Sequence, residues 1–345
     1  MTPEPLSESF LNRPKAELHI HLRGAMPAAF FAELVAKHPI EQALTDAPDG
    51  QLAFMGAASH LAPVLEGSLS PEASADALFR FKTFPEFLAS YLFTSYFFRD
   101  IEDFRRLILA VRETLVAQNI VYAEVTVSLI EYIQRGLKLP EMLAVMDEAA
   151  ATETVRIRWI VDLVRDVGTE VALDLLKDCL AQKPASLCGI TLGGAEHKVP
   201  AREFVEHYQL AREHGLGLTA HAGEAMGPES VWDTVRLLGV NRIGHGVRSI
   251  EDPRLVEYLA EKQIPLEVCP TSNLKTGVYS SYTEHPVRKL YDAGVPISIN
   301  TDDPSFFACT LNDEFRCLAN VGFSEDELDG LVGNSFSQAF TSVRP

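Results

Sequence analysis

The chain has 345 residues, with 30 Lys and Arg against 48 Asp and Glu, which gives a formal charge of −18. This acidity argues against a partner bound mainly through phosphate neutralisation, so we expect no nucleic-acid partner. Apolar residues make up 47% and charged residues 23% of the sequence. That composition is typical of a globular protein with a large core and not of a disordered chain.

The sequence predicts a soluble protein. No stretch approaches the ~18 uncharged residues that a bilayer-spanning helix needs, and residues 1–10 carry acidic residues and prolines instead of an apolar run. The number of cysteines is odd and no Cys-x-x-Cys spacing occurs, which favours free thiols over a disulfide framework. The five cysteines are Cys179, Cys188, Cys269, Cys309 and Cys317. We therefore expect a cytoplasmic protein that does not contact a membrane.

Short β-rich apolar runs alternate with longer amphipathic segments along the chain. The runs occupy residues 17–22, 120–128, 155–164, 187–194, 216–224, 242–247, 264–272 and 295–304. Eight strands alternating with helices can close a parallel barrel, so the sequence predicts an α/β fold of the (β/α)8 TIM-barrel type, with residues 1–345 as one domain. The alternative is a doubly wound open sheet, but no glycine-rich phosphate loop follows the first run. Segment 204–215 illustrates the helical pattern, since it is amphipathic and ends on Gly215.

The first two runs lie too far apart for a single crossover helix, so we expect a helical, lid-like insertion around residues 25–119. Its segment 79–98 holds nine aromatic residues, and five positions fall on one helical face. These positions are Phe84, Phe87, Leu88, Tyr91 and Ser95. One interpretation is a helix that packs on the barrel. The other is a lid whose aromatic side chains also line a pocket for a flat ligand, because an insertion after the first strand lies at the barrel mouth.

His19 and His21 are two residues apart in the first run, so both point to the same face of a strand, which in a barrel is the interior. A lone histidine would more often be a core residue, but a pair favours metal ligands. His221 and Asp302 lie at the ends of the fifth and eighth runs, where barrel active sites form. The four residues therefore predict a metal site. Imidazole donors favour zinc over magnesium or calcium, although iron, manganese or cobalt would also fit.

Three further titratable side chains occur at the same strand ends. Glu224 follows His221 by three residues, so it can face the metal site without binding the ion, as a proton shuttle requires. His245 is flanked by glycines that allow a close approach, and Asp303 adjoins Asp302. Tight packing of His245 and loop capping by Asp303 are the alternatives. Because several strands place such groups at one end of the predicted barrel, we predict that Glu224, His245 and Asp303 are catalytic.

The segments ELHIHLRG, TAHAGE, RIGHG, CPTSN and NTDDP occur in this order across residues 15–305. In this combination the sequence resembles the adenosine deaminase family of the amidohydrolase superfamily, which includes deaminases of the adenosine, adenine and aminodeoxyfutalosine types. The resemblance implies a purine deaminase on a (β/α)8 barrel, with one Zn²⁺ per chain on the four ligands above. It implies that Glu224 protonates the ring nitrogen and that His245 and Asp302 orient the hydroxide. It also implies that Asp303 and the backbone N–H of Gly194 bind the purine.

Two positions depart from the family pattern. Arg23 stands where members that act on adenosine typically have an aspartate, and Ala195 stands where an acidic residue is common. If the first strand continues, residue 23 shares a face with residues 19 and 21, so the guanidinium points toward the same mouth. Arg23 either forms a salt bridge with a carboxylate of the protein or binds a carboxylate or phosphate of the substrate. The second alternative predicts an adenine compound with an anionic or extended 5′ substituent.

The predicted reaction is the hydrolytic deamination of a 6-aminopurine compound with release of ammonia. Adenosine, adenine and a 5′-modified adenine nucleoside are the candidate substrates. A zinc ion lowers the pKa of bound water from about 15.7 to about 7, which makes a nucleophile available at neutral pH. The alternatives are another metal-dependent hydrolase, acting on an amide, ester or phosphate, and an inactive barrel kept as a binding protein. The latter requires a lost ligand or acid, whereas all seven predicted metal and catalytic residues are present.

Overall fold

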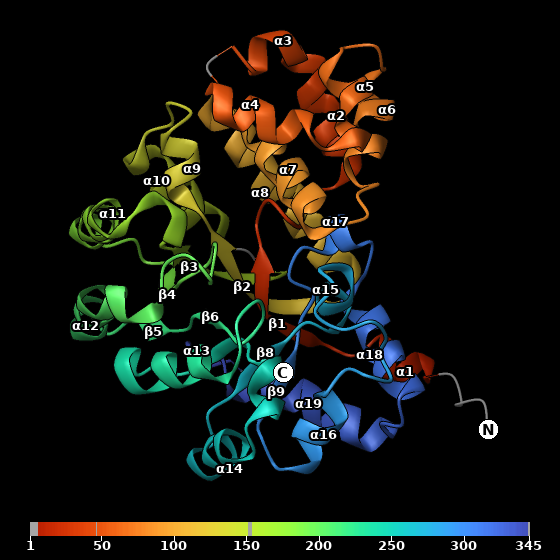
Figure 1. Cartoon of the computed structure of the whole chain (residues 1–345), viewed down its shortest axis with the longest axis vertical. Helices are drawn as coiled ribbons and strands as arrows, with labels where there is room; N and C mark the ends of the chain where they lie inside the picture. Colours follow the sequence, from red (N-terminus) through yellow and green to blue (C-terminus); the bar gives the residue numbers. More distant parts are fainter. Residues whose placement is uncertain (1–5, 46, 151–153, 344–345) are drawn as a thin grey trace.

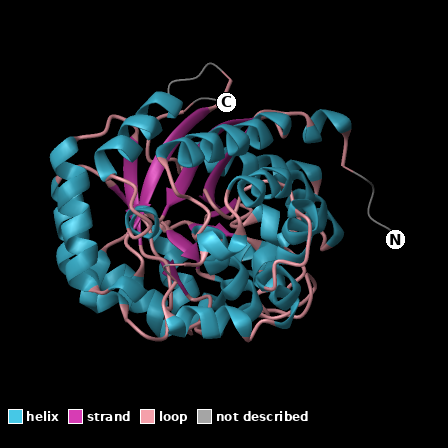
Figure 2. Ribbon diagram, turned by 90° about the horizontal axis from the view of Figure 1, so that it is seen from above, coloured by secondary structure: helices cyan, strands magenta, loops and turns pink. Residues whose placement is uncertain are grey.

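The computed structural model describes residues 6–45, 47–150 and 154–343, which form a curled parallel sheet surrounded by helices (Figure 2). Residues 1–5 of the opening segment considered above lie outside these ranges. The strands are β1 (Lys15–His21), β2 (Ile120–Val127), β3 (Arg156–Asp162), β4 (Leu187–Thr191), β5 (Gly217–Leu218), β6 (His221–Ala222), β7 (Ile243–His245), β8 (Leu266–Val268) and β9 (Ile297–Ile299). Neighbouring strands pair in parallel, as predicted.

Two sheets together form the barrel. The first has the order β1-β2-β3-β4-β5 and the second β6-β7-β8-β9. The predicted fifth run is divided between β5 and β6, with only Thr219 and Ala220 between them. Where the chain returns to β1, the N–H of Asp302 donates to the carbonyl of His19 at 3.0 Å, and its carbonyl accepts from the N–H of His21 at 2.8 Å. Asp302 therefore joins the last strand to the first.

The strand sequences explain why the sheet is buried on both faces. β2 reads IVYAEVTV and β3 reads RIRWIVD, and nearly all of their residues are buried. Such β-branched runs suit parallel strands that have helices on one face and the barrel interior on the other. Phe340 packs inside against the early parts of β4 and β5, where a Cβ added to Gly217 would lie 2.2 Å from its ring. The guanidinium of Arg242 lies 3.6 Å from the centroid of the same ring.

A helix of the outer ring follows each strand or pair of short strands. These helices are α8 (Ile101–Ala117), α10 (Leu139–Ala150), α11 (Thr169–Gln182), α12 (Val205–Glu213), α13 (Pro228–Asp233), α14 (Pro253–Lys262), α16 (Val287–Asp292) and α19 (Glu325–Ser337). Asp100 and Asp103 form a capping box that starts α8, which satisfies backbone N–H groups at that end. The helix predicted over 204–215 is α12, and Gly215 follows it with a left-handed φ of 73°.

A group of short helices between β1 and α8 interrupts the barrel pattern and lies together at one side of the barrel (Figure 1). They are α2 (Ala28–Lys37), α3 (Ile40–Ala43), α4 (Asp49–Gly56), α5 (Ala62–Leu65), α6 (Pro71–Leu78) and α7 (Phe84–Ser95). The segment after β1 is thus helical, as predicted. The predicted bounds 25–119 also include α8, which packs against β2 and α10 as a member of the outer ring.

The aromatic helix α7 packs against α17 (Pro304–Phe307), which directly follows the Asp302–Asp303 segment. The ring of Phe87 lies 5.5 Å from that of Phe306 and 5.1 Å from that of Phe307. Phe84 and Leu88 are 37% and 39% exposed, so the predicted common face of α7 is buried only in part. The insertion therefore contacts the barrel beside residues 302 and 303.

The remaining α-helices are short and occur in loops or near the ends of the described chain. They are α1 (Glu8–Leu11), α9 (Leu129–Ile133), α15 (Pro270–Lys275) and α18 (Leu311–Asn320). The strand predicted over 264–272 was too long, because Pro270 starts α15, in the first helical position that proline favours. Within the residues described, no helix is both long enough and apolar enough to cross a membrane.

Candidate active site and metal centre

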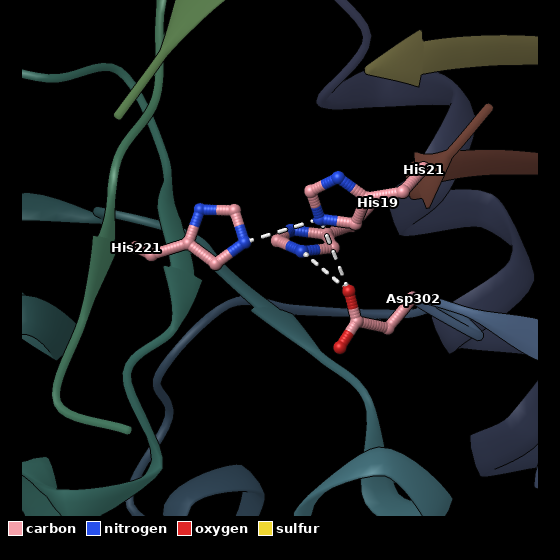
Figure 3. A group of neighbouring side chains, drawn as sticks. All are labelled: His19, His21, His221 and Asp302. Carbon is pink, nitrogen blue, oxygen red and sulfur yellow. Dashed lines mark hydrogen bonds and ion pairs between the residues drawn. The ribbon is translucent and has the colours of Figure 1, made fainter. Parts of the chain in front are cut away.

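Four predicted ligands meet at the carboxyl ends of the strands (Figure 3). His19 and His21 come from β1, His221 from β6, and Asp302 from the segment after β9. One possible ligand atom of each lies within 4.8 Å of the others. Oδ1 of Asp302 is 3.2 Å from Nε2 of His21 and 3.4 Å from Nε2 of His19. The Nε2 atoms of His21 and His221 are 3.3 Å apart. Three imidazoles and one carboxylate thus converge.

The donors fit a metal ion. Nε2 of His19 is buried and has no hydrogen-bond partner among the residues described, while Nδ1 of the same ring is 2.8 Å from Oε2 of Glu267. A buried nitrogen without a partner is unfavourable unless a ligand binds it. A histidine whose Nδ1–H donates to a carboxylate keeps the lone pair of Nε2 free for a metal. Figure 3 shows this nitrogen directed toward Asp302. The cluster is therefore a candidate metal site.

Burial and neighbouring charges set the protonation states of these groups. Burial lowers the pKa of His19, but the carboxylates of Asp302 and Glu267 raise it to about 10. Burial, followed by the charge of His19, holds the pKa of His221 well below its usual value. Burial raises the pKa of Asp302, but its interactions with His19 and His21 bring it well below its usual value. Asp302 as a carboxylate and His221 as a neutral imidazole are in the states that metal binding requires, whereas His19 must release a proton when a metal ion binds.

Glu224 lies just beyond β6, next to the cluster. Its Oε2 is 3.6 Å from Nε2 of His245. Burial raises the pKa of Glu224 to about 8, and the negative charges of Asp302 and Glu196 add to this effect. A carboxyl group that keeps its proton near neutral pH can act as a general acid. The structure therefore places Glu224 beside the candidate metal cluster, in surroundings that favour its protonated form.

Glu196 holds the segment that carries Glu224, and the sequence analysis did not identify it. Its Oε1 accepts from the N–H of Gly223 at 2.7 Å, and its Oε2 accepts from those of Ala225 and Met226 at 2.9 Å each. Hydrogen bonds to a charged acceptor are the stronger kind, so this carboxylate fixes the backbone on both sides of Glu224. Glu196 is the last residue of the segment LGGAE, from which only Gly194 and Ala195 were considered as candidate site residues.

His245 ends β7, and its Nε2 is 3.9 Å from Oδ2 of Asp302. Both residues have left-handed backbone conformations, with φ of 60° and 66°. Non-glycine residues rarely adopt such values, and those that do cluster at functional sites. Oδ2 of Asp302 also accepts from the hydroxyl of Ser272 at 2.7 Å. Burial lowers the pKa of His245 to about 3, so its imidazole is neutral.

Asp303 is buried, and its Oδ1 has no hydrogen-bond partner within the described chain. Burial and the charge of Asp302 raise its pKa to about 7. A Cβ added to Gly24 would lie 1.8 Å from Oδ1 of Asp303, so only glycine leaves space for this carboxyl. Gly194 lies beyond β4 with φ of 86°, and a Cβ there would lie 2.6 Å from Oδ2 of Asp166. Both glycines thus allow close approaches in loops at the carboxyl edge of the barrel.

Arg23 forms an ion pair with Glu131 of α9, the short helix that follows β2. The guanidinium also lies 4.0 Å from the ring centroid of Tyr91, and its side chain is 2% exposed. This is the salt bridge that one of the two predicted alternatives requires. Nε and Nη2 of Arg23, however, have no hydrogen-bond partner in the part of the chain that the structure describes. The contact with Glu131 therefore leaves two buried donors of Arg23 unsatisfied.

A parallel barrel that carries three histidines and an aspartate at the carboxyl ends of its strands is typical of metal-dependent enzymes. The family model described as adenosine deaminase matches residues 67–344. Aminodeoxyfutalosine deaminase of Streptomyces avermitilis is 35% identical over 95% of this chain and 86% of its own length. The structure of adenine deaminase from Arthrobacter aurescens is similar at a TM-score of 0.82 and 27% identity, over 95% of this chain and 94% of that chain. An amidohydrolase from Burkholderia ambifaria with bound Zn has the same fold, with a TM-score of 0.82, 24% identity, and coverage of 99% and 92%.

The chain belongs to the adenosine deaminase family. It is a purine aminohydrolase, and the reaction of its class is the metal-dependent deamination of 6-aminopurine compounds. The predicted family and barrel fold are thereby confirmed. The alternatives of an unrelated metal-dependent hydrolase and of an inactive binding protein are set aside. The relatives differ in substrate, since their names divide between aminodeoxyfutalosine, adenosine and adenine deaminases.

Proposed function

We propose that this enzyme binds one zinc ion per chain and releases ammonia from an adenine nucleoside with an extended or anionic 5′ substituent. The observation that carries the proposal is the convergence of three imidazoles and one carboxylate beside Glu224, a carboxyl whose pKa burial raises to about 8. Borderline imidazole donors support zinc, as does the Zn bound by the amidohydrolase of the same fold. When bound, zinc supplies Lewis-acid activation of water at neutral pH.

The surrounding side chains transfer protons, orient the attacking oxygen and bind the purine. Glu224 donates its proton to the ring nitrogen beside the attacked carbon, which stabilises the tetrahedral species, and later passes a proton to the departing ammonia. His245 and Asp302 face the position of the attacking oxygen. Asp303 binds the imidazole part of the purine, since Oδ1 is buried without a partner and its raised pKa allows it to donate or accept a hydrogen bond. The N–H of Gly194 binds the six-membered ring.

The substrate proposal rests on Arg23. Its guanidinium lies close enough to Asp303 to lower the pKa of that carboxyl, against the larger effects of burial and Asp302. Nε and Nη2 are buried donors without a hydrogen-bond partner among the described residues, and an anionic substituent that reached them would satisfy both. The relative named aminodeoxyfutalosine deaminase, at 35% identity over 95% of the chain, supports a modified nucleoside. Adenine is the second candidate, because relatives named adenine deaminases match as much of the chain.

We also propose that α2 to α7 form a lid over the barrel mouth. The contacts of Phe87 with Phe306 and Phe307 connect this insertion to the segment that carries Asp302 and Asp303. A shift of Asp303 on ligand binding would therefore also shift α7 through these contacts. We place the enzyme in the cytoplasm, which agrees with the five free thiols.

The test is ammonia release from adenine, adenosine and 5′-modified adenine nucleosides, including aminodeoxyfutalosine. Purified protein should contain about one zinc ion per chain, and a chelator should abolish activity that added zinc restores. A metal-free preparation with full activity would refute the mechanism. Preference for unmodified adenosine or for free adenine would refute the substrate proposal.

Two variants decide the role of Arg23. Arg23→Ala should raise KM for an anionic 5′-modified substrate by about tenfold or more and leave adenosine nearly unaffected, because a bidentate charged contact is lost. Glu131→Gln also breaks the ion pair but leaves the guanidinium, so it should not raise KM for the anionic substrate. Equal effects of both variants on all substrates would show that the pair is purely structural.

A further inference from the structure

A chain of hydrogen bonds reaches His245 from the beginning of α16. The N–H of Val287 is the first helical N–H of α16 and has no partner within the helix, as expected at a helix start. It donates to Nδ1 of His285 at 3.2 Å. Burial lowers the pKa of His285 to about 3, so the imidazole is neutral and carries a single proton. Because Nδ1 accepts, that proton lies on Nε2.

The next link fixes a side-chain amide. Nε2 of His285 lies 3.1 Å from Oδ1 of Asn273, a fully buried residue of α15. An N–H donor requires the carbonyl oxygen of the amide at this position, so the orientation of the Asn273 amide follows from the backbone N–H of Val287. The amide nitrogen then faces the other way, and Nδ2 lies 3.3 Å from Nδ1 of His245.

We infer that Asn273 and His285 are positioning residues that hold His245 in the tautomer with its proton on Nε2. Asn273 donates to Nδ1 of His245, so this nitrogen is an acceptor. Nε2–H of His245 then points into the active site, toward Oε2 of Glu224 at 3.6 Å and Oδ2 of Asp302 at 3.9 Å. This inference concerns the site of the proposed deaminase and rests on that function.

The tautomer decides which chemistry His245 can perform. Its one lone pair, on Nδ1, is engaged by Asn273, so His245 cannot accept a proton from the attacking water. It acts instead as a fixed donor that stabilises negative charge on the reacting oxygen. The proton of the water must therefore pass to solvent, or to Glu224 after Glu224 has given its own proton to the ring nitrogen. This assigns a role to Asn273 of the segment CPTSN, which the sequence analysis noted without a role.

The direct test is the tautomer of His245 in the zinc-loaded wild-type enzyme. Two-bond ¹H–¹⁵N correlation spectra of protein labelled in its 10 histidines distinguish a protonated from an unprotonated ring nitrogen. The peak that disappears in His245→Gln identifies the residue. We expect a protonated Nε2 and an unprotonated Nδ1. A protonated Nδ1 in the wild-type enzyme overturns the inference, whether or not any variant folds.

Asn273→Asp should reverse the tautomer, because a carboxylate accepts and cannot donate. We expect the proton of the neutral His245 ring to lie on Nδ1 in this variant, with normal zinc content. We also expect kcat to be lowered on the order of 10²-fold with little change in KM. The matched control is Asn241→Asp, since the amide of Asn241 accepts from the N–H of Leu218, a bond that aspartate retains. It should leave both the spectrum and kcat unchanged.

His285→Phe removes the outer donor without touching His245. The Asn273 amide should then be free to rotate, and the spectrum of His245 should show both tautomers, with a smaller loss of kcat than in Asn273→Asp. An unaltered tautomer in both variants overturns the positioning role. If the wild-type tautomer is as inferred but no purine releases ammonia, the proposed function fails and the positioning role stands.

Discussion

Glu267 connects the proposed metal ligand His19 to Arg242 inside the barrel, because its Oε2 lies 2.8 Å from Nδ1 of His19 while its Oε1 accepts from Nε of Arg242 at 2.6 Å. Burial raises the pKa of Glu267, but Arg242 and His19 bring it to about 2, so it is ionised. Its charge orients the ring of His19 and strengthens the donor at Nε2. Sequence reasoning did not identify Glu267, although a carboxylate in the buried run LEVC is a signal of such a role.

Glu267→Gln should weaken zinc binding by about 10- to 100-fold, because the neutral amide is a poorer acceptor for His19. Competition with a chromophoric chelator measures the affinity. Glu124→Gln is the matched control, since Glu124 binds Nη2 of the same Arg242 at 2.6 Å and makes no contact with His19. The control should lower stability but leave zinc affinity unchanged. Equal affinities of the wild-type and Glu267→Gln proteins would contradict the assigned role.

Glu224→Gln should separate proton transfer from metal binding. The amide keeps the size and polarity of the side chain but cannot protonate the ring nitrogen, so we expect near-normal zinc content and kcat lowered by about 10²-fold or more. Metal analysis and steady-state kinetics provide the two measurements. Glu229→Gln, on an exposed residue of α13, is the control and should match the wild type. Loss of zinc from Glu224→Gln would make Glu224 a ligand.

Gly24→Ala should displace Asp303. The added Cβ would lie 1.8 Å from Oδ1 and 2.7 Å from Cβ of Asp303, so the carboxyl cannot keep its position. We expect kcat/KM to fall by about 10²-fold, because a misplaced binding group can have this effect, with zinc content retained. Gly50→Ala, in α4 with open space around the added Cβ, is the control. An active Gly24→Ala enzyme with normal KM would argue against purine binding by Asp303.

Glu314 should make stability depend on pH. Burial raises its pKa from 4.5 to about 8, so the folded protein keeps a proton that the unfolded chain releases near pH 4.5. The contribution of this group is therefore most favourable below the unfolded pKa and declines as pH rises toward the folded pKa, with a slope of at most about 1.4 kcal/mol per pH unit. Urea unfolding should show that Glu314→Gln, compared with the wild type, lacks this decline. Parallel pH profiles would contradict the raised pKa.

The sequence predicts the positions of strand ends better than the contacts between distant side chains. His19 and His21 share a face through the two-residue period, and His221 and Asp302 follow from the number of strands and the end at which barrels place their sites. The partner of Arg23 did not follow, because any of 48 acidic residues could have paired with it, and only the fold brings Glu131 there.

Other differences have local causes. The fifth run appeared as one strand because its apolar pattern is continuous. In the structure its ladder partners change from β4 at Gly217 and Leu218 to β7 at His221 and Ala222, although the N–H groups of Thr219 and His221 still donate to the carbonyls of Ile190 and Leu192. The network around His245 could not be derived from periodicity, since it depends on how α15 and α16 pack. Glu196 was overlooked because its partners are backbone N–H groups, which no sequence pattern displays.

Asp302 both joins the end of the sheet to β1 and supplies a side chain to the candidate metal cluster, so closing the barrel and assembling that cluster are one event. During synthesis, a nascent chain from which residue 302 has not yet emerged carries His19, His21 and His221 but lacks the backbone hydrogen bonds that join Asp302 to β1. A metal ion bound after closure would link β1 to the segment after β9 and slow the separation of the first and last strands. Zinc occupancy would then report on chains whose barrel has closed.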